Sequence, residues 1–212
     1  MTFPARASPS RAGRLRLRRS LDVALRGADL LEQKLHILQV RHALLLDAEQ
    51  TCAGRWHEQV AAAETWLLRA LVLGGEQALA AAAEGTGAAE ITVDETSTMG
   101  VRHPSGASCS IPDRDPTAAA PRNTALAQAE AAYREAVQVA AEYAAARAAA
   151  RLVGAELLRV RHRVRALRRH WIPRLEEALA RVGLALEQSD HEDAIRRRWA
   201  AQRAGARGST RE

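Results

Sequence analysis

A regular alternation of hydrophobic and polar positions runs through the first third of the chain, in steps of four and three residues. Such steps form the heptad seam of a helix that winds around a second helix. No proline interrupts the pattern, and at about 1.5 Å per residue it predicts a rod of roughly 85 Å. We expect a first coiled-coil helix over residues 14–83, with a possible break at Gly74-Gly75. The seam consists of Leu17, Leu21, Ala24, Ala28, Leu31, Leu35, Leu38, His42, Leu45, Glu49, Cys52, Trp56, Gln59, Ala63, Trp66, Ala70 and Leu73.

A second ladder supplies the partner helix, which we expect over residues 123–199. After Trp171 the ladder takes extra steps of four, a stutter that locally unwinds a supercoil. Pro173 falls inside this stutter, and an interior proline costs roughly 3 kcal/mol and bends a helix. We therefore expect a kink there. The second seam consists of Leu126, Ala129, Tyr133, Ala136, Ala140, Tyr143, Val153, Leu157, Val160, Val164, Leu167, Trp171, Leu175, Leu179, Val182 and Leu186.

Between the two ladders, residues 84–122 are rich in glycine and proline. The β-branched run at Ile91–Val93 and the apolar pair Met99 and Val101 predict two short strands, a hairpin, followed by a loop. Ser10 and Asn123 or Thr124 are suitable helix caps. The predicted fold class is all-α: a long antiparallel two-helix coiled-coil hairpin with a small β-hairpin and loop head at the turn. Residues 1–13 form an N-terminal extension and residues 200–212 a basic tail.

Composition supports helices rather than a thick globular core, because aromatic residues make up 3% of the chain and alanine and leucine supply most of the apolar positions. The sequence has no apolar run long enough to span a membrane and no secretory signal at its start. Cys52 on the seam and Cys109 in the head make no disulfide framework, which favours a reducing cytoplasm.

The net charge of +6 is concentrated in arginines. Nucleic-acid binding is one interpretation of such clusters, and a solvated helix surface is the other. No aromatic platform accompanies the arginines and no DNA-binding motif is present, while a membrane-surface helix is the weakest interpretation because the apolar stripe is narrow. The clusters are Arg6, Arg11, Arg14, Arg16, Arg18 and Arg19; Arg159, Arg161, Arg163, Arg165, Arg168, Arg169 and Arg174; and Arg196, Arg197, Arg198, Arg203, Arg207 and Arg211.

Catalytic constellations are missing from the sequence. The seven histidines show no metal-ligand spacing with cysteine or carboxylate support, and His103 with Cys109 is a weak pair. Gly85 and Gly87 form no phosphate loop, because no Gly-Lys-Ser/Thr follows. His42 is interpreted as a polar seam residue that fixes register. We expect no catalytic residue, metal or cofactor, and a protein that is not an enzyme by itself.

The segment Pro9–Leu38 resembles the opening of the D subunit of V-type and A-type rotary ATPases, which has Pro-Thr-Arg/Lys, leucines, Ala-x-x-Gly and Leu-Leu-x-x-Lys. Lys34, the only lysine of the chain, matches the family's lysine. Ser10 stands in place of the family's threonine. The matching positions are Pro9, Arg11, Leu15, Leu17, Leu21, Ala24, Gly27, Leu30, Leu31, Lys34 and Leu38.

Two further segments resemble the same family. Met99-Gly100-Val101 with Pro104 is similar to the short Met-Gly-Val-x-x-Pro element of the head. The C-terminal signature, Arg-Val-Asn-Ala-Leu-Glu followed by Ile-Pro, has Arg165 and Arg168 here in place of asparagine and glutamate. Its matching positions are Arg163, Val164, Ala166, Leu167, Ile172, Pro173 and Leu175.

The resemblance implies a central-stalk rotor shaft that transmits torque between the membrane ion-translocating ring and the catalytic ring, in ATP synthesis or hydrolysis coupled to proton or sodium transport. It implies four kinds of partner: the ATPase A and B subunits around the end with both termini, the small F subunit on the shaft, and the ring-capping C (or d) subunit at the other end. It further implies a peripheral complex on the cytoplasmic side of the cell membrane, without direct membrane insertion, and a head hairpin that modulates hydrolysis.

We expect partner contacts at Arg11, Arg14, Arg18, Met99, Val101, Arg163, Arg196 and Arg197. No nucleic-acid partner is expected. The alternative function is a basic coiled-coil protein that binds nucleic acid or acts as an adaptor; strongly salt-dependent DNA retention would support it.

Overall fold

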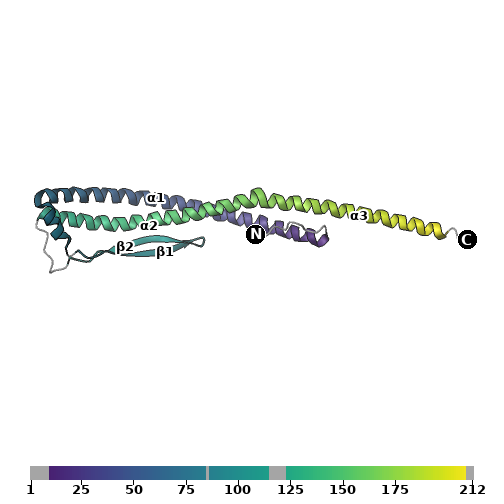
Figure 1. Ribbon diagram of the computed structural model, residues 1–212, viewed down its shortest axis with the longest axis horizontal. Helices are drawn as coiled ribbons and strands as arrows, with labels where there is room; N and C mark the ends of the chain where they lie inside the picture. The colour runs from purple at the N-terminus through teal and green to yellow at the C-terminus, as the bar shows by residue number, and fades with distance from the viewer. Residues whose placement is uncertain (1–9, 85, 115–122, 209–212) are drawn as a thin grey trace. The chain divides into compact units, whose positions relative to one another are not determined.

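The computed structural model describes residues 10–84, 86–114 and 123–208. Its elements, in chain order, are α1 (Arg11–Ala83), β1 (Glu90–Thr98), β2 (Val101–Ser110), α2 (Thr124–Ala166), the π-helical turn η1 (Leu167–Trp171) and α3 (Ile172–Gly208) (Figure 1). The two strands form one antiparallel sheet. The predicted fold class is confirmed. Contacts divide the chain into two compact units, Met1–Gln33 with Val160–Glu212, and Lys34–Arg159, which are described in turn.

Both long helices begin at the caps that the sequence predicts. The backbone N–H of Gly13 donates a hydrogen bond of 3.0 Å to the Ser10 hydroxyl, and that of Leu126 donates one of 2.7 Å to Oδ1 of Asn123. Each cap satisfies a backbone donor that has no partner within the helix itself. Cap residues therefore set where α1 and α2 start.

In the first unit, the beginning of α1 packs antiparallel against α3. The order of contacts shows the direction: Arg11 meets Asp190, while Asp29 meets Arg168 further along α1. The shared core is a single apolar cluster that follows the predicted seams except at Ile172, which is buried although the seam was expected to pass through Trp171. α3 continues to Gly208, beyond the end expected near Trp199. The buried members of the cluster are Leu17, Ala24, Ala28, Ile172, Leu175 and Val182.

Directly before Pro173, where the sequence predicts a kink, the helix contains a π-helical turn, η1. The backbone N–H of Ile172 bonds to the carbonyl of Leu167, five residues back instead of four. Such a turn inserts one extra residue into the helix, and Pro173, which has no N–H, follows directly. The extra residue absorbs the stutter in the heptad ladder, so that Ile172 and Leu175 are again buried.

In the second unit, the rest of α1 runs antiparallel to α2. Trp56 stacks on Tyr143 with ring centroids 5.5 Å apart, and Arg55 pairs with Glu142 at 3.0 Å. The observed α2 seam passes through Val139, so Tyr133 and Ala140 are half-buried beside it rather than in its centre. α1 ends at Ala83 after a break at Gly75, whose φ of 69° is non-helical. The buried seam residues of α2 in this unit include Ala129, Ala136, Val139, Ala150, Val153 and Leu157.

A second face of α2 is buried as well. Ala141 and Ala145 follow Ala136 by five and nine residues, which places them about half a turn away from the seam. They are nevertheless only 4% and 7% exposed. The β1–β2 hairpin extends along α2 (Figure 1), and His103 on β2 is 1% exposed. Small alanine side chains thus form a second buried face of α2.

The hairpin is longer than the short strands expected from the sequence. Its register runs from Glu90 opposite Ser110 to Thr98 opposite Val101, with a bulge at Ser105. The bulge places Cys109 and His103 on opposite faces of β2.

Arg114 anchors the base of the hairpin. Its guanidinium donates hydrogen bonds to two backbone carbonyls at the end of α1, those of Ala82 and Glu84. It also pairs with Glu130 of α2 at 3.0 Å. One side chain therefore fixes the head to both helices.

Two glycines on the paired helices make a matched test of this packing. A Cβ at Gly54 would meet nothing within 4 Å, whereas one at Gly154 would lie 2.7 Å from Nε2 of His42. Gly54→Ala should raise the free energy of unfolding by about 0.5–1 kcal/mol, because alanine favours helix. Gly154→Ala should bring no such gain, because the His42 ring must leave its place at the seam. Urea unfolding measures both; an equal gain from the two substitutions would contradict the packing described.

Candidate partner-binding surfaces

The predicted arginine contacts lie on the surface of the first unit. Arg14, Arg18, Arg163 and Arg197 are exposed, but two others are partly neutralised by acids. Arg11 pairs with Asp190 at 3.3 Å, and Arg196 pairs with Glu192 and Asp193 at 3.2 and 3.1 Å. The structure thus brings Arg11 to the acidic stretch of α3 that precedes the C-terminal arginines. Acidic side chains therefore lie among the arginines at this place.

The basic band in the sequence suggested a free surface cation at Arg168, but this partly exposed side chain is paired with two acids. Its guanidinium binds Glu32 through Nε and Nη2, at 2.8 and 3.1 Å, and Asp29 through Nη2 at 2.6 Å. The hydrogen bond from Arg168 lowers the pKa of Glu32 below its ordinary value, against a smaller opposing effect of desolvation. The planar guanidinium thus clamps two carboxylates of α1 to η1.

Lys34, the residue that matches the family's lysine, forms a cross-helix pair in the second unit. Its ammonium lies 3.3 Å from Oε1 of Glu156, and both side chains are largely covered. Burial disfavours the ionised form of Glu156, but hydrogen bonds and charges from Lys34 and Arg159 outweigh it and lower the pKa of Glu156. Lys34 therefore links α1 to α2, so its contact is with this chain itself.

An uncovered apolar stripe lies on α1 beside the buried seam. Ile37, Val40 and Leu44 are spaced as i, i+3 and i+7, which places them along one side of the helix. They are 43%, 53% and 59% exposed. The sequence held the signal for this stripe, since a second apolar heptad accompanies the seam, but the residues were not among the predicted contacts.

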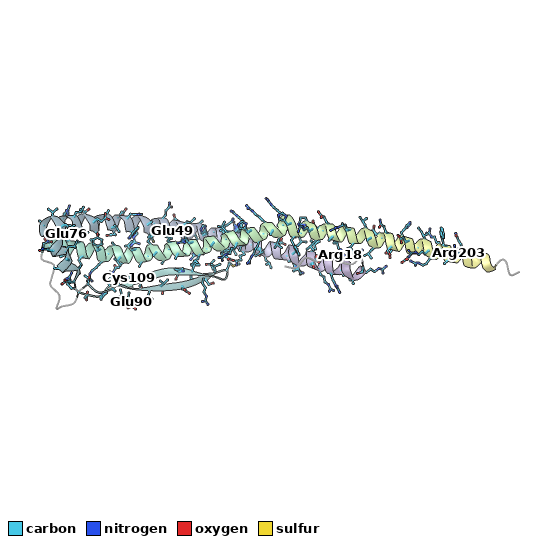
Figure 2. The ribbon with its side chains drawn as sticks, in the orientation of Figure 1. Arg18, Glu49, Glu76, Glu90, Cys109 and Arg203 are labelled. Carbon is cyan, nitrogen blue, oxygen red and sulfur yellow. The ribbon has the colours of Figure 1, made fainter. Side chains whose placement is uncertain are left out.

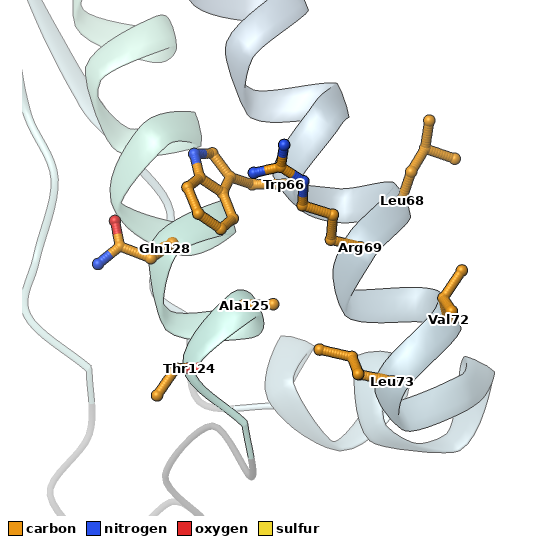
Figure 3. A pocket seen from close by; sticks show the side chains of 8 residues that line it. All are labelled: Trp66, Leu68, Arg69, Val72, Leu73, Thr124, Ala125 and Gln128. Carbon is orange, nitrogen blue, oxygen red and sulfur yellow. The ribbon is translucent and has the colours of Figure 1, made fainter.

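A wider apolar groove lies between α1 and the beginning of α2 (Figure 3). It has a volume of about 560 Å³, and Val72 in its wall is 86% exposed. The Arg69 guanidinium lies 4.6 Å from the Trp66 ring centroid, so the groove has one cation in an otherwise apolar wall. The lining residues are Trp66, Leu68, Arg69, Val72, Leu73, Thr124, Ala125 and Gln128.

The head carries the remaining predicted contacts. Met99 lies in the turn between the strands and is 46% exposed, while Val101 is half-buried. His103 is committed to structure: one ring nitrogen lies 3.0 Å from the Thr98 hydroxyl and the other 2.8 Å from the carbonyl of Pro104. His103 and Cys109 are thus not brought together as ligands.

Among residues 10–84, 86–114 and 123–208, no three histidine, cysteine or acidic side chains gather where they could hold a metal ion. None of the helices in that part of the chain has an apolar stretch long enough to cross a bilayer. Figure 2 shows charged side chains along the helices.

Comparison with known proteins agrees with this arrangement. The family model for the D subunit of ATP synthase matches residues 14–202. The chain belongs to the ATP synthase D-subunit family. It is 32% identical over 212 residues to the D subunit of a V-type ATP synthase from Anaeromyxobacter sp. (strain Fw109-5), and the match covers 97% of this chain and 98% of that protein. The resemblance noted in the sequence is confirmed, and the protein is a non-catalytic central-stalk subunit of a rotary ATPase.

The Arg168 clamp generates a pH prediction. Because the folded pKa of Glu32 lies below its unfolded value, the pair stabilises the fold above the unfolded pKa of about 4.3, and this contribution is lost as the pH falls through the folded pKa. Arg168→Gln should return the Glu32 pKa toward its ordinary value and flatten the acid limb of stability. NMR titration of the Glu32 carboxyl measures the shift.

Arg165→Gln is the matched control for this prediction, since the exposed Arg165 makes no ion pair with any residue that the structure describes. The Arg165→Gln substitution should leave the pKa of Glu32 unchanged. Equal titration curves for the wild-type chain and Arg168→Gln would contradict the clamp.

Proposed function

We propose that this protein is the shaft that transmits torque between a membrane ion-translocating ring and a ring of catalytic A and noncatalytic B subunits. The observation that carries the proposal is the pairing of long helices within each unit. α1 alone has 73 residues, and partner helices follow it by ion pairs and buried seams in both units. A paired helix resists twisting and bending better than a single one, because its seam must be disrupted before it deforms.

The end of α3 is the proposed insertion into the A/B ring. Within residues 187–203 no side chain is buried, and Ile195 and Trp199 are exposed one helical turn apart. Arg196, Arg197 and Arg198 lie between them. This mixture of apolar and cationic side chains would complement an inner surface of the A/B ring that is apolar and carries acidic or carbonyl-rich contacts.

Truncation after Gln188 tests this insertion. We expect the shortened chain to assemble but to lower coupled ATP hydrolysis several-fold, because the stretch that meets the ring is gone. A full-length chain with Arg196, Arg197 and Arg198 changed to Gln separates charge from length. Coupled hydrolysis that is unchanged by the truncation would refute the insertion proposal.

The two apolar surfaces of the second unit are the proposed sites of the small F subunit and the ring-capping C subunit. We assign the Ile37–Val40–Leu44 stripe to the F subunit, since a helix or sheet of a small partner can cover a narrow stripe. We assign the groove beside Trp66 to the ring-capping subunit, because its pocket-like form accepts inserted side chains. The complex as a whole would lie on the cytoplasmic side of the membrane, without insertion of this chain.

Paired charge substitutions distinguish the two sites. Val40→Asp should lower affinity for the F subunit at least tenfold, corresponding to about 1.4 kcal/mol, and leave binding of the ring-capping subunit unchanged. Val72→Asp should lower affinity for the ring-capping subunit and leave binding of the F subunit unchanged. Both side chains are more than half exposed, so neither change should unfold the chain. Binding of the separately purified subunits by calorimetry measures each effect, and a loss of the same partner in both variants would refute the assignment.

The general proposal has its own test. Tagged protein isolated from its native cells at high salt should retain large nucleotide-binding subunits and a small companion subunit, identified by mass spectrometry. Nucleic acid alone in the retained fraction would instead favour the alternative of a basic coiled coil.

A further inference from the structure

Three cations recur along one flank of α1 in the second unit. Lys34, Arg41 and Arg55 follow one another at intervals of seven and fourteen residues, so they occupy the same heptad position beside the buried seam. Lys34 lies 3.3 Å from Oε1 of Glu156, and Arg55 lies 3.0 Å from Oε2 of Glu142. Arg41, between them, makes no hydrogen bond or ion pair with any residue that the structure describes. It departs from a series of cross-helix pairs.

The heptad repeat explains why Arg41 lacks an acid on α2. In an antiparallel pair, fourteen residues back along α1 correspond to fourteen residues forward along α2. Counted from the pair that Arg55 makes, the α2 residue opposite Arg41 is therefore Glu156. Each oxygen of Glu156 already accepts a hydrogen bond of 3.3 Å, Oε1 from Lys34 and Oε2 from Arg159. Arg41 is thus left without the acid that its position predicts.

The side chain of Arg41 is unfavourable for the free chain. Its Nε is buried and has no acceptor, and a buried donor without an acceptor destabilises a fold, more so when the group is charged. Methionine is about as long as arginine and has a similar helix propensity, and it would fill this position without a buried donor. Contacts within the described chain therefore give no reason for an arginine here.

Arg41 borders the exposed apolar stripe of α1. Ile37 and Leu44 lie four residues before it and three residues after it, so both share its side of the helix. Val40 is its neighbour in the sequence, and all three apolar side chains are exposed. A molecule that covers the stripe therefore reaches the guanidinium as well. Such a molecule needs a negative group at this place, because its arrival removes water from the cation.

We propose that Arg41 binds a carboxylate of the small F subunit when that subunit covers the stripe. Apolar contacts have no direction, whereas an ion pair fixes the register of the partner on the helix. The inference rests on the proposed function for the identity of the partner, and it adds the chemistry by which the partner is recognised.

Arg168 shows, elsewhere in the chain, the geometry that this ion pair takes. Its Nε and Nη2 bind the two oxygens of Glu32 at 2.8 and 3.1 Å. The same edge of Arg41 includes the buried Nε, so the side chain must rotate outward to present it. Rotation of Arg41 breaks no hydrogen bond with any described residue, and rotamer changes of this kind are common when proteins bind.

The free chain provides the first test. Arg41→Met removes the buried donor and keeps a side chain of similar helix propensity, so the urea midpoint of unfolding should stay the same or rise. A lower midpoint would show that Arg41 stabilises the chain itself, and would overturn the proposal.

Calorimetry with the separately purified F subunit tests the contact. Arg41→Met should lower the affinity at least tenfold and make it less dependent on salt, because salt screens an ion pair. Arg41→Lys keeps the charge but loses the planar fork, so it should restore the salt dependence and part of the affinity. Arg55→Met is the matched control, since Arg55 has the same heptad position but is already paired; it should change neither quantity. An unchanged affinity in Arg41→Met, or a loss with the salt dependence of the wild type, would overturn the proposal.

The two proposals fail separately. If the F subunit does not bind the wild-type chain, or binds Val40→Asp as tightly, the assignment of the stripe is refuted and the Arg41 contact with it. If Val40→Asp lowers the affinity but Arg41→Met does not, the Arg41 inference alone is refuted.

Discussion

The constraint on which the second unit depends is that α2 is covered on two opposite faces at once. α1 covers the seam that includes Ala136 and Ala150, and the face with Ala141 and Ala145 is buried half a turn away. Only small side chains allow neighbours to approach on both sides, which explains the alanine-rich sequence of this helix. The cost is weak apolar stabilisation, because each methylene that an alanine lacks forgoes about 0.8 kcal/mol of burial.

Polar and aromatic contacts between α1 and α2 compensate for the weak apolar stabilisation of the alanine layers. Trp56 stacks on Tyr143 where alanines dominate α2, and ion pairs such as Lys34–Glu156 cross between the helices. Exposed ion pairs contribute little individually, but their spacing along the two helices fixes register, which alanine layers specify poorly. The same logic holds in the first unit, where Arg168 clamps two carboxylates one turn of α1 apart.

Local signals predicted much of this fold from the sequence. The α1 seam, the Ser10 and Asn123 caps and the disturbance at Pro173 all depend on nearby residues, whose effects are readable along the chain. The π-helical form of that disturbance was not readable, because a stutter can be absorbed by unwinding, bending or an inserted residue, and the packing of Ile172 and Leu175 decides among them.

The surfaces for partners were the harder part, for a physical reason. The clustered charge in the sequence predicted arginines as partner contacts. Whether an arginine is free to bind a partner depends, however, on acids far away in the chain, as the pairing of Arg168 with Asp29 and Glu32 demonstrates. Exposed apolar side chains were more informative once burial was known: Val40 and Val72 lie on helices whose seams are already occupied. A helix pair with a filled seam gains nothing internally from such residues. Their presence is therefore best explained by contacts outside the chain, as expected for a protein that works only in an assembly.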